Sequence, residues 1–312
     1  MKDVISLIEK NKRRSLSFAD VFYLVMAALP IVACIILKIL TNPASEGINI
    51  SGPLIYFTVP TPIQPLTVTE SQVNSLAVII SIFWICIFLT RDLKTRPESK
   101  RQIAAEWIVE KTESLVKGNM GDYFTGFPPF VAAIMGLSAM SSLLSLFGLF
   151  PPTSDLNIVG GWAILVFILI THYKFKCGPV SYVKSFAQPV ALAPLNVISE
   201  IATPISMAFR HYGNVLSGSV VSVLVGAALQ GLSLKLFEWL PSVFSKIPFL
   251  RVGIPAVLSL YFDLFSGCLQ AFIFAMLTML YVANGFSEDE YFRRRREKQM
   301  RKNNINNKVK VR

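Results

Sequence analysis

Long apolar stretches, each almost free of charged residues, dominate the pattern of hydrophobic and polar positions along the chain. A helix needs roughly 20 mostly apolar residues to cross the hydrocarbon core of a bilayer. Six segments approach or exceed that length, so the pattern predicts an all-α, polytopic membrane protein with about six membrane helices. The segments are Val21–Leu37, Ser71–Thr90, the uncharged residues between Asp122 and Asp155, Leu156–Thr171, Ile201–Leu234 and Val252–Ser287.

The composition agrees with this fold class. Hydrophobic residues make up 53% of the 312 residues and charged residues only 16%, whereas soluble domains average about 45–50% and about 25%. A disordered chain is excluded as well, because disorder requires low hydrophobicity.

The basic residues lie on one side of the predicted spans. If the N-terminus is cytoplasmic, the cytoplasmic pieces hold 25 of the 30 Lys and Arg residues and the external pieces only three. Positive residues concentrate on the cytoplasmic side of membrane proteins, so both termini are predicted to be cytoplasmic. This topology explains the net charge of +11, and no nucleic-acid partner is needed to account for it.

Three segments outside the central spans have their own interpretations. Val21–Leu37 is predicted to be an uncleaved membrane helix, with a signal peptide as the alternative. Residues 41–70 contain five prolines and no basic residue, which predicts an irregular external loop. Arg101–Gly118 has the pattern of an amphipathic helix on the cytoplasmic membrane surface, with a soluble linker helix as the alternative. Its predicted apolar face contains Ala104, Trp107, Ile108 and Leu115.

No motif for covalent chemistry is present in the sequence. The chain lacks a Gly-rich phosphate loop, an H-E-x-x-H motif and paired Cys or His residues, and its four cysteines lie in or beside different apolar segments. We therefore expect no cofactor, no metal site and no catalytic residues.

Two charges lie inside the last two apolar segments. Arg210 is the only formal charge in Ile201–Leu234, and Asp263 is the only one in Val252–Ser287. An arginine at the centre of a membrane helix costs about 2.5–3.5 kcal/mol on insertion scales and stays charged, whereas a buried carboxyl group can take up a proton. A fixed cation beside a titratable acid suits an ion pathway. An internal Arg210–Asp263 ion pair that only joins two helices is the simpler alternative.

Helical spacing favours the ion pathway. Arg210, Asn214 and Ser217 fall on one helical face, and Asp263 and Gln270, seven residues apart, predict a second polar face. Glu200 lies ten residues before Arg210, roughly 15 Å along a helix, which places an acid near the cytoplasmic side. His211 points away from the stripe and is predicted to be a packing residue.

The last segment, Val252–Ser287, is too long for an upright span. As one helix, its 36 residues would extend about 54 Å, nearly twice the hydrocarbon thickness, so the helix must tilt steeply or break. The same argument applies to Ile201–Leu234. Two long, tilted helices would suit a surface that wraps a neighbouring protein.

Several motifs resemble the a subunit of bacterial F-type rotary ATP synthases. They are PLNVISEIATPISMAFRHYGNVLSG (Pro194–Gly218), LQAFIFAMLTMLYV (Leu269–Val282), PTSDLN (Pro152–Asn157) and TVTES (Thr67–Ser71). The resemblance implies a non-catalytic stator subunit of the cell membrane that offers two half-channels to a rotating ring of c subunits. It implies as partners this c-ring, the b subunit of the peripheral stalk, the rest of the synthase and the lipid bilayer.

The resemblance also implies site residues. Arg210 would attract the ring carboxylate, with Asn214 and Gln270 beside it, Asp263 in the external half-channel and Glu200 on the cytoplasmic side. Ser206 and Ser217 complete the candidate ion path. The coupling ion would be H⁺ or Na⁺, and a secondary ion or anion transporter with a buried Arg210–Asp263 site is the alternative function.

The sequence departs from the family pattern in three places. R-L-F-G-N is replaced by R-H-Y-G-N, and Ser219 stands where relatives often carry an acid or histidine. The third departure is an extra N-terminal helix. The predicted division is therefore an N-terminal extension over 1–66, a family core over 67–284 and a basic cytoplasmic tail over 285–312.

Overall fold

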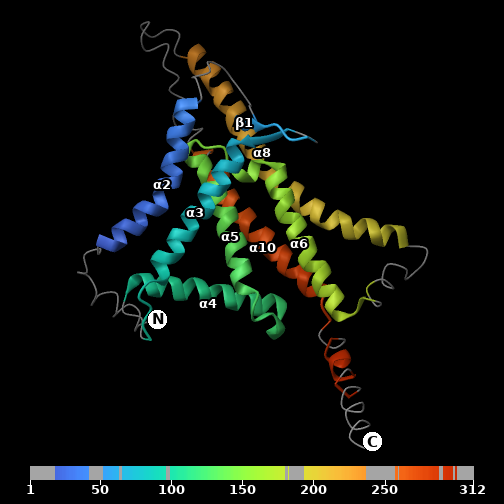
Figure 1. Ribbon diagram of the computed structural model, residues 1–312. Helices are drawn as coiled ribbons and strands as arrows, with labels where there is room; N and C mark the ends of the chain where they lie inside the picture. Colours follow the sequence, from blue (N-terminus) through green and yellow to red (C-terminus); the bar gives the residue numbers. More distant parts are fainter. Residues whose placement is uncertain are drawn as a thin grey trace, which may run out of the picture.

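The chain folds into long helices that cross one another (Figure 1) around an apolar core. The computed structural model describes residues 18–41, 52–62, 65–95, 99–179, 182, 193–236, 257–258, 260–287, 291–297 and 299–300. Within these residues, six helices are long and apolar enough to span a membrane, which confirms the predicted fold class. They are α2 (Phe18–Thr41), α3 (Glu70–Thr90), α5 (Pro128–Leu143, continued by η2, Leu144–Phe147), α6 (Leu156–Cys177), α8 (Ala193–Leu236) and α10 (Gly267–Asn284, preceded by η5, Leu260–Ser266).

The ends of several helices are specified by local sequence. A capping box of Thr69 and Gln72 begins α3, and the Asp155 carboxylate accepts the Asn157 amide at 2.9 Å at the start of α6. Ser99 caps α4 (Lys100–Met120), which ends at Gly121 with a φ of 84°. Such caps satisfy backbone groups that helix ends leave unpaired, so these helices begin and end where their sequences require.

The predicted external loop over residues 41–70 is only partly irregular. It contains an antiparallel hairpin of β1 (Ile55–Val59) and β2 (Leu66–Thr69), with an irregular register between Ile55 and Phe57. The prediction missed these strands because the prolines between them read as loop, whereas prolines are also tolerated where two strands are joined.

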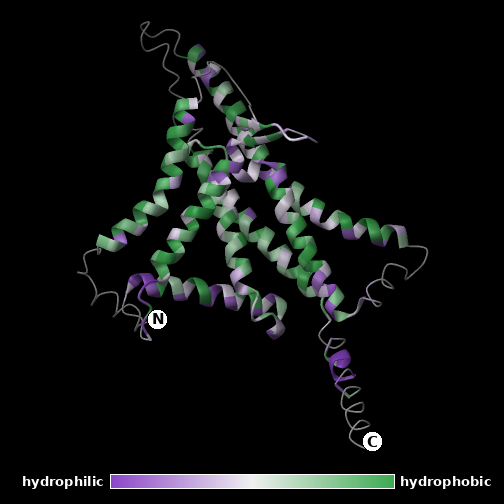
Figure 2. Cartoon of the chain, in the orientation of Figure 1, coloured by the Kyte–Doolittle hydropathy of each residue, from purple (hydrophilic) through white to green (hydrophobic). Residues whose placement is uncertain are grey.

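The helix α4 lies across the ends of the spanning helices α3 and α5 in Figure 1. Its Val116 and Met120 enter the main apolar core, which also includes Val131 of α5 and Met279 of α10. Trp107 and Ile108, on the predicted apolar face, are exposed. These two side chains are therefore available to contact lipid, as they would on a membrane surface, whereas Leu115 of the same predicted face packs against the core. Figure 2 shows the mixed hydrophilic and hydrophobic surface of α4 beside the mostly hydrophobic spans.

The N-terminal helix α2 is fastened to the remaining helices near both of its ends. Arg101 Nη1 of α4 lies 2.6 Å from Asp20 Oδ1, and Lys38 Nζ lies 2.8 Å from Glu70 Oε1 at the start of α3. Between these ion pairs, Cys34 is buried in an apolar cluster with Val78. The charged residues near both ends of α2 therefore form ion pairs with α3 and α4, and the apolar residues between them have the composition of a membrane span.

We expect loss of Lys38 to loosen α2. The Glu70 side chain is 2% exposed, and a buried carboxylate deprived of its cation is strongly destabilising. In a protein whose other cysteines are replaced by alanine, Lys38→Met should increase the rate of maleimide labelling at buried Cys34 about tenfold. Lys38→Arg should keep the slow labelling rate of the parent protein. The double variant Lys38→Met/Glu70→Gln should label almost as slowly, because no buried carboxylate is left without a cation. Equal labelling in all four proteins would contradict a structural role for the pair.

Candidate functional site

The polar residues of the last two spans meet along an antiparallel contact between α8 and the η5–α10 helix. Asn214 Nδ2 donates to Ser266 Oγ at 2.9 Å, and Ser266 Oγ donates to Asn214 Oδ1 at 3.1 Å. One turn further along α8, a Cβ on Gly218 would lie 3.1 Å from the Phe262 Cβ. The absence of a side chain at Gly218 therefore permits the close approach, and the two contacts fix the register of the helices.

This register places the predicted residues at matching levels. Because the helices are antiparallel and Asn214 lies beside Ser266, Arg210, four residues earlier on α8, lies at the same height as Gln270, four residues later on α10. Ser217 likewise lies at the level of Asp263. From Glu200 to Arg210 the helix rises about 15 Å, and from Arg210 to Ser217 about 10 Å. The candidate site is thus a series of polar levels along one helix pair.

Arg210 lies on the exposed surface of α8. In the part of the chain that the structure describes, its guanidinium forms no ion pair with Asp263 or any other carboxylate. Ser206 and Ser217 on the same stripe are also exposed, and Asn214 is half-buried. The internal Arg210–Asp263 ion pair, which was the simpler alternative, is therefore absent.

The neighbouring residue, His211, lies on a different face of α8, about 100° around the helix from Arg210. It is fully buried, its Nε2 lies 3.2 Å from Ser138 Oγ of α5, and its ring lies edge-on to Phe274 of α10. Its predicted role as a packing residue is confirmed.

Ser219 donates to the Leu216 carbonyl of its own helix at 2.8 Å.

Asp263 lies in the π-helical segment η5, where it is half-buried. A π-helix turns less per residue than an α-helix, so the spacing of seven residues does not by itself place Asp263 on the face of Gln270, which is buried. The predicted single polar face assumed a regular α-helix, which η5 is not, so a shared face for Asp263 and Gln270 stays a prediction. This π-helix continues directly into α10, so Leu260–Asn284 forms one helix, and residues 252–256 and 259 of the long segment lie outside the described residues.

Glu200 lies toward the other end of α8 and is held by two partners. Lys174 Nζ of α6 lies 2.6 Å from Glu200 Oε1, and the Tyr182 hydroxyl donates to the same carboxylate at 3.2 Å. Burial, followed by the negative charge of Glu200, raises the pKa of Tyr182. Glu200 and Tyr281 line a small cavity of about 120 Å³ between α6, α8 and α10, and its lining is partly polar and partly apolar.

Sequence reasoning missed a buried polar cluster between the start of α3 and the start of α6. Ser71 donates to Asp155, Glu70 accepts the Phe150 amide at 3.1 Å, and Asn74 Nδ2 donates to the Phe150 carbonyl at 2.9 Å. These residues belong to or adjoin the TVTES and PTSDLN motifs, which served only as family signatures. Ser266 was missed too, because one serine in an apolar span is an ordinary residue.

Comparisons with a family model and with individual known proteins point to the same family. The family model described as ATP synthase A chain matches residues 72–283. ATP synthase subunit a of Priestia megaterium is 32% identical over 244 residues, which cover 73% of this chain and 97% of the relative. Subunit a of Lysinibacillus sphaericus is 30% identical over 239 residues, covering 72% and 94%. Subunit a 1 of Crocosphaera subtropica is 30% identical over 204 residues, covering 64% and 79%.

Proposed function

The chain belongs to the ATP synthase A chain family, and from that premise we propose that Arg210 is the fixed charge facing the carboxylates of a rotating c-ring. Within this family the chain is the non-catalytic, ion-translocating stator subunit of an ATP synthase and a multi-pass membrane protein. The proposal concerns which residues carry the ion and which surface meets the ring.

The exposed position of Arg210 carries the proposal. A guanidinium cannot lose its proton at physiological pH, and an unpaired charge within a membrane span is costly. Arg210 forms no ion pair with a described carboxylate of its own chain. A carboxylate on another subunit would relieve this cost, and a ring would supply a new carboxylate at each step of rotation.

Two half-channels on either side of the Arg210 level fit the order of the polar groups. The external half-channel contains Asp263 and Ser217 at one level and the hydrogen-bonded pair of Asn214 and Ser266 at the next. The cytoplasmic half-channel begins at the cavity beside Glu200. The exposed stripe from Ser206 to Ser217 faces the ring, and an ion crosses the gap between the half-channels only when it is carried on the ring.

The fixed charge then makes ion flow productive. One elementary charge moving through 100 mV releases about 2.3 kcal/mol, so several ions must be coupled to each ATP. Arg210 favours the ionised form of an arriving carboxylate and repels a free cation that would pass directly between the half-channels. The chain thus contributes a path and an electrostatic barrier, without breaking covalent bonds.

The remaining assignments follow from the same role. The chain resides in the cell membrane with both termini in the cytoplasm and contacts the b subunit of the peripheral stalk. Residues 67–284 form the family core, with 1–66 as an extension and 285–312 as a basic tail. Figure 1 shows the start of α2, α4 and residues 291–297 toward the same end of the molecule, an arrangement that supports this orientation. A transporter site made by a buried Arg210–Asp263 pair has no support, because the pair is absent among the described residues.

Cysteine cross-linking in the intact complex tests which face of α8 meets the ring. With native cysteines replaced by alanine and one cysteine beside the ring carboxylate, Ser206→Cys and Ser217→Cys should cross-link and stop rotation until a reductant is added. Ile205 is the matched control, because it is also exposed but lies about 140° around the helix from Arg210. Cross-linking from Ile205→Cys and not from the two serines would place the ring on the wrong side of α8 for this proposal.

A further inference from the structure

A lysine at the end of α6 reaches the acid of the proposed cytoplasmic half-channel. Lys174 Nζ donates to both carboxylate oxygens of Glu200, at 2.6 Å to Oε1 and at 2.7 Å to Oε2. The two side chains are only 23% and 17% exposed, so solvent screens the pair less than it would screen a surface ion pair. The positive charge that this acid attracts is therefore already supplied by the chain itself.

The lysine is supported along its length by two neighbours. A Cβ on Gly285 would lie 3.1 Å from Lys174 Cγ and 3.2 Å from Cε, so the absence of a side chain there lets the lysine stem lie against the end of α10. Lys174 Nζ also lies 5.5 Å from the centre of the Tyr182 ring, within the range of cation–π attraction. These contacts direct the ammonium group of Lys174 to Glu200.

The Lys174–Glu200 pair lines the cavity of about 120 Å³ between α6, α8 and α10. One water molecule occupies about 30 Å³ in the liquid, so the cavity has room for water. Among the described residues that line it, Lys174 and Glu200 are the only charged ones, and Thr203, Tyr281 and Asn284 also bear side-chain oxygen atoms. Hard metal cations take oxygen ligands such as carboxylates and amide carbonyls. Without the lysine, this lining would have the composition of a cation site.

The ammonium group of Lys174 changes which ions the cavity accepts. A metal cation at the Glu200 carboxylate would lie beside the charge of Lys174, and like charges this close repel each other strongly outside bulk water. A proton needs no shell of oxygen ligands, because it moves between water molecules and hydroxyl groups as hydrogen bonds are exchanged. The pair is neutral as a whole, so its net charge does not oppose that movement. The pair therefore discriminates between a metal cation and a proton.

We propose that Lys174 is a specificity-determining residue of the cytoplasmic half-channel, which prevents sodium and other metal cations from binding at Glu200 while protons pass. This inference rests on the proposed function, because it takes Glu200 to line the path of the coupling ion. It goes beyond that function by assigning the half-channel to protons and by assigning the selectivity to a lysine that lies outside the polar face of α8.

Sodium at the cytoplasmic face of the intact synthase tests this role. The synthase is placed in vesicles with its catalytic head outward, and an imposed pH gradient and membrane potential drive ATP synthesis. The outer medium contains either sodium chloride or choline chloride at about 0.1 M, which keeps the ionic strength constant. The wild type should give equal rates in the two media.

Lys174→Met should make synthesis dependent on sodium. The rate should be at least about threefold lower in sodium than in choline, as expected when sodium occupies the exit of the protons with a Kd of about 50 mM. Lys174→Arg keeps a cation beside Glu200 and should remain insensitive to sodium. The double variant Lys174→Met/Glu200→Gln should also lose the dependence on sodium, because the acid that would bind sodium is absent. A lysine with a purely structural role would not produce this pattern.

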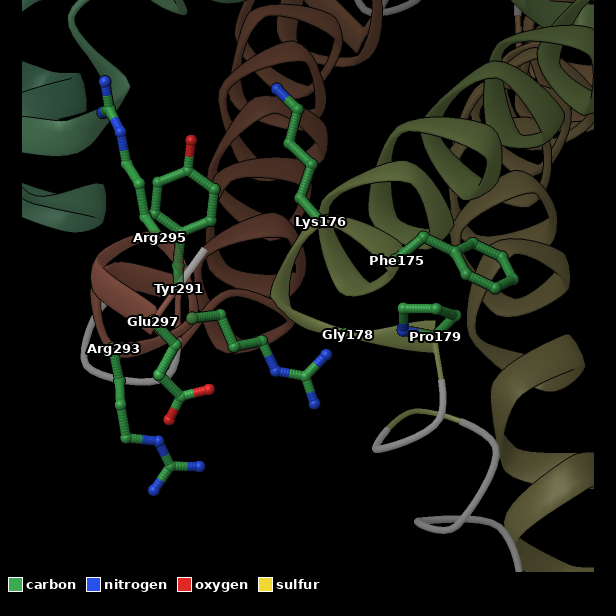
Figure 3. A pocket seen from close by; sticks show the side chains of 9 residues that line it. Phe175, Lys176, Gly178, Pro179, Tyr291, Arg293, Arg295 and Glu297 are labelled. Atoms are coloured by element: carbon green, nitrogen blue, oxygen red, sulfur yellow. The ribbon is translucent and has the colours of Figure 1, made fainter. Parts of the chain in front are cut away.

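Lys176 is the matched control for the loss of charge. It lies two residues further along α6, about 200° around the helix, and lines the separate cavity shown in Figure 3. Its Nζ lies 5.0 Å from the centre of the Tyr173 ring. Lys176→Met should therefore leave the ratio of the rates in sodium and choline at the wild-type value.

Two results would overturn the inference. One is a Lys174→Met rate that is equal in sodium and in choline, and the other is a wild-type synthase that is slowed or driven by sodium. If Lys174→Met does not assemble, Lys174→Gln takes its place under the same criteria, because its amide can still donate a hydrogen bond to Glu200. Arg210→Ala should lose synthesis in both media, so a failure of the proposed ring contact is seen separately from a failure of the selectivity.

Discussion

Replacing Arg210 with alanine is expected to reduce ion-driven ATP synthesis at least about a hundredfold while leaving the complex assembled. In the proposed complex, Arg210 and the ring carboxylate form a charge pair that is buried between the two subunits. Removing one partner of a buried charge pair costs about 3–5 kcal/mol, and each 1.36 kcal/mol is tenfold in rate. Assembly should survive because Arg210 is exposed on α8 and forms no ion pair with a described carboxylate of its own chain. The measurement is ATP synthesis by vesicles containing the purified synthase under an imposed ion gradient and membrane potential.

The control for this variant is Ser206→Ala, one turn away on the same exposed stripe. It removes a hydroxyl group and no charge, so synthesis should fall by less than about threefold. If Arg210→Ala retains coupled synthesis, Arg210 is not the fixed charge of the motor. If Arg210→Ala fails to assemble with the ring, its contribution is structural.

Replacing Asp263 with asparagine should slow ion flux through the external half-channel about tenfold or more. An amide cannot take up and release a proton, and a positioned acid or base accelerates proton transfer about 10²–10⁴-fold. Asp263 is half-buried in η5, close to the hydrogen-bonded pair of Asn214 and Ser266. Loss of the carboxylate should therefore remove the one acidic group at this level of the helix pair.

Ion flux into vesicles through the membrane sector measures this effect directly. Asp263→Glu should retain most of the flux because it keeps a carboxyl group, and Ser217→Ala, at the same level, should have little effect. Unchanged flux in Asp263→Asn would mean that ions enter along another route. In that case the polar cluster of Ser71 and Asp155 would be the next place to examine.

The candidate site was largely predictable because charge is conspicuous in an apolar segment. Arg210 and Asp263 were each the single formal charge of a long span, and a charge persists there only if something stabilises it. Helical spacing also separated the exposed Arg210 from His211, which packs against Ser138 and Phe274. Residues that carry a large free-energy cost in a membrane span can thus be identified from the sequence alone, without knowledge of their contacts.

Features that depend on tertiary contacts or on helix type were not predictable. The sequence of η5 contains no helix-breaking residue, so nothing in it signals a π-helix. Ser266 becomes important only through its bonds to Asn214. Similarly, Lys38 and Glu70 lie 32 residues apart, and no periodicity within one helix reveals a partner on another.

The passive ion conductance of the membrane sector, measured without the catalytic head, tests the role of Arg210 most directly. Vesicles containing the wild-type sector should hold an ion gradient across a locked ring, because the Arg210 charge separates the half-channels. Arg210→Ala should dissipate that gradient faster, and adding Asp263→Asn should slow the leak again by closing the external path. A gradient held equally well by the wild type and by Arg210→Ala would contradict the account.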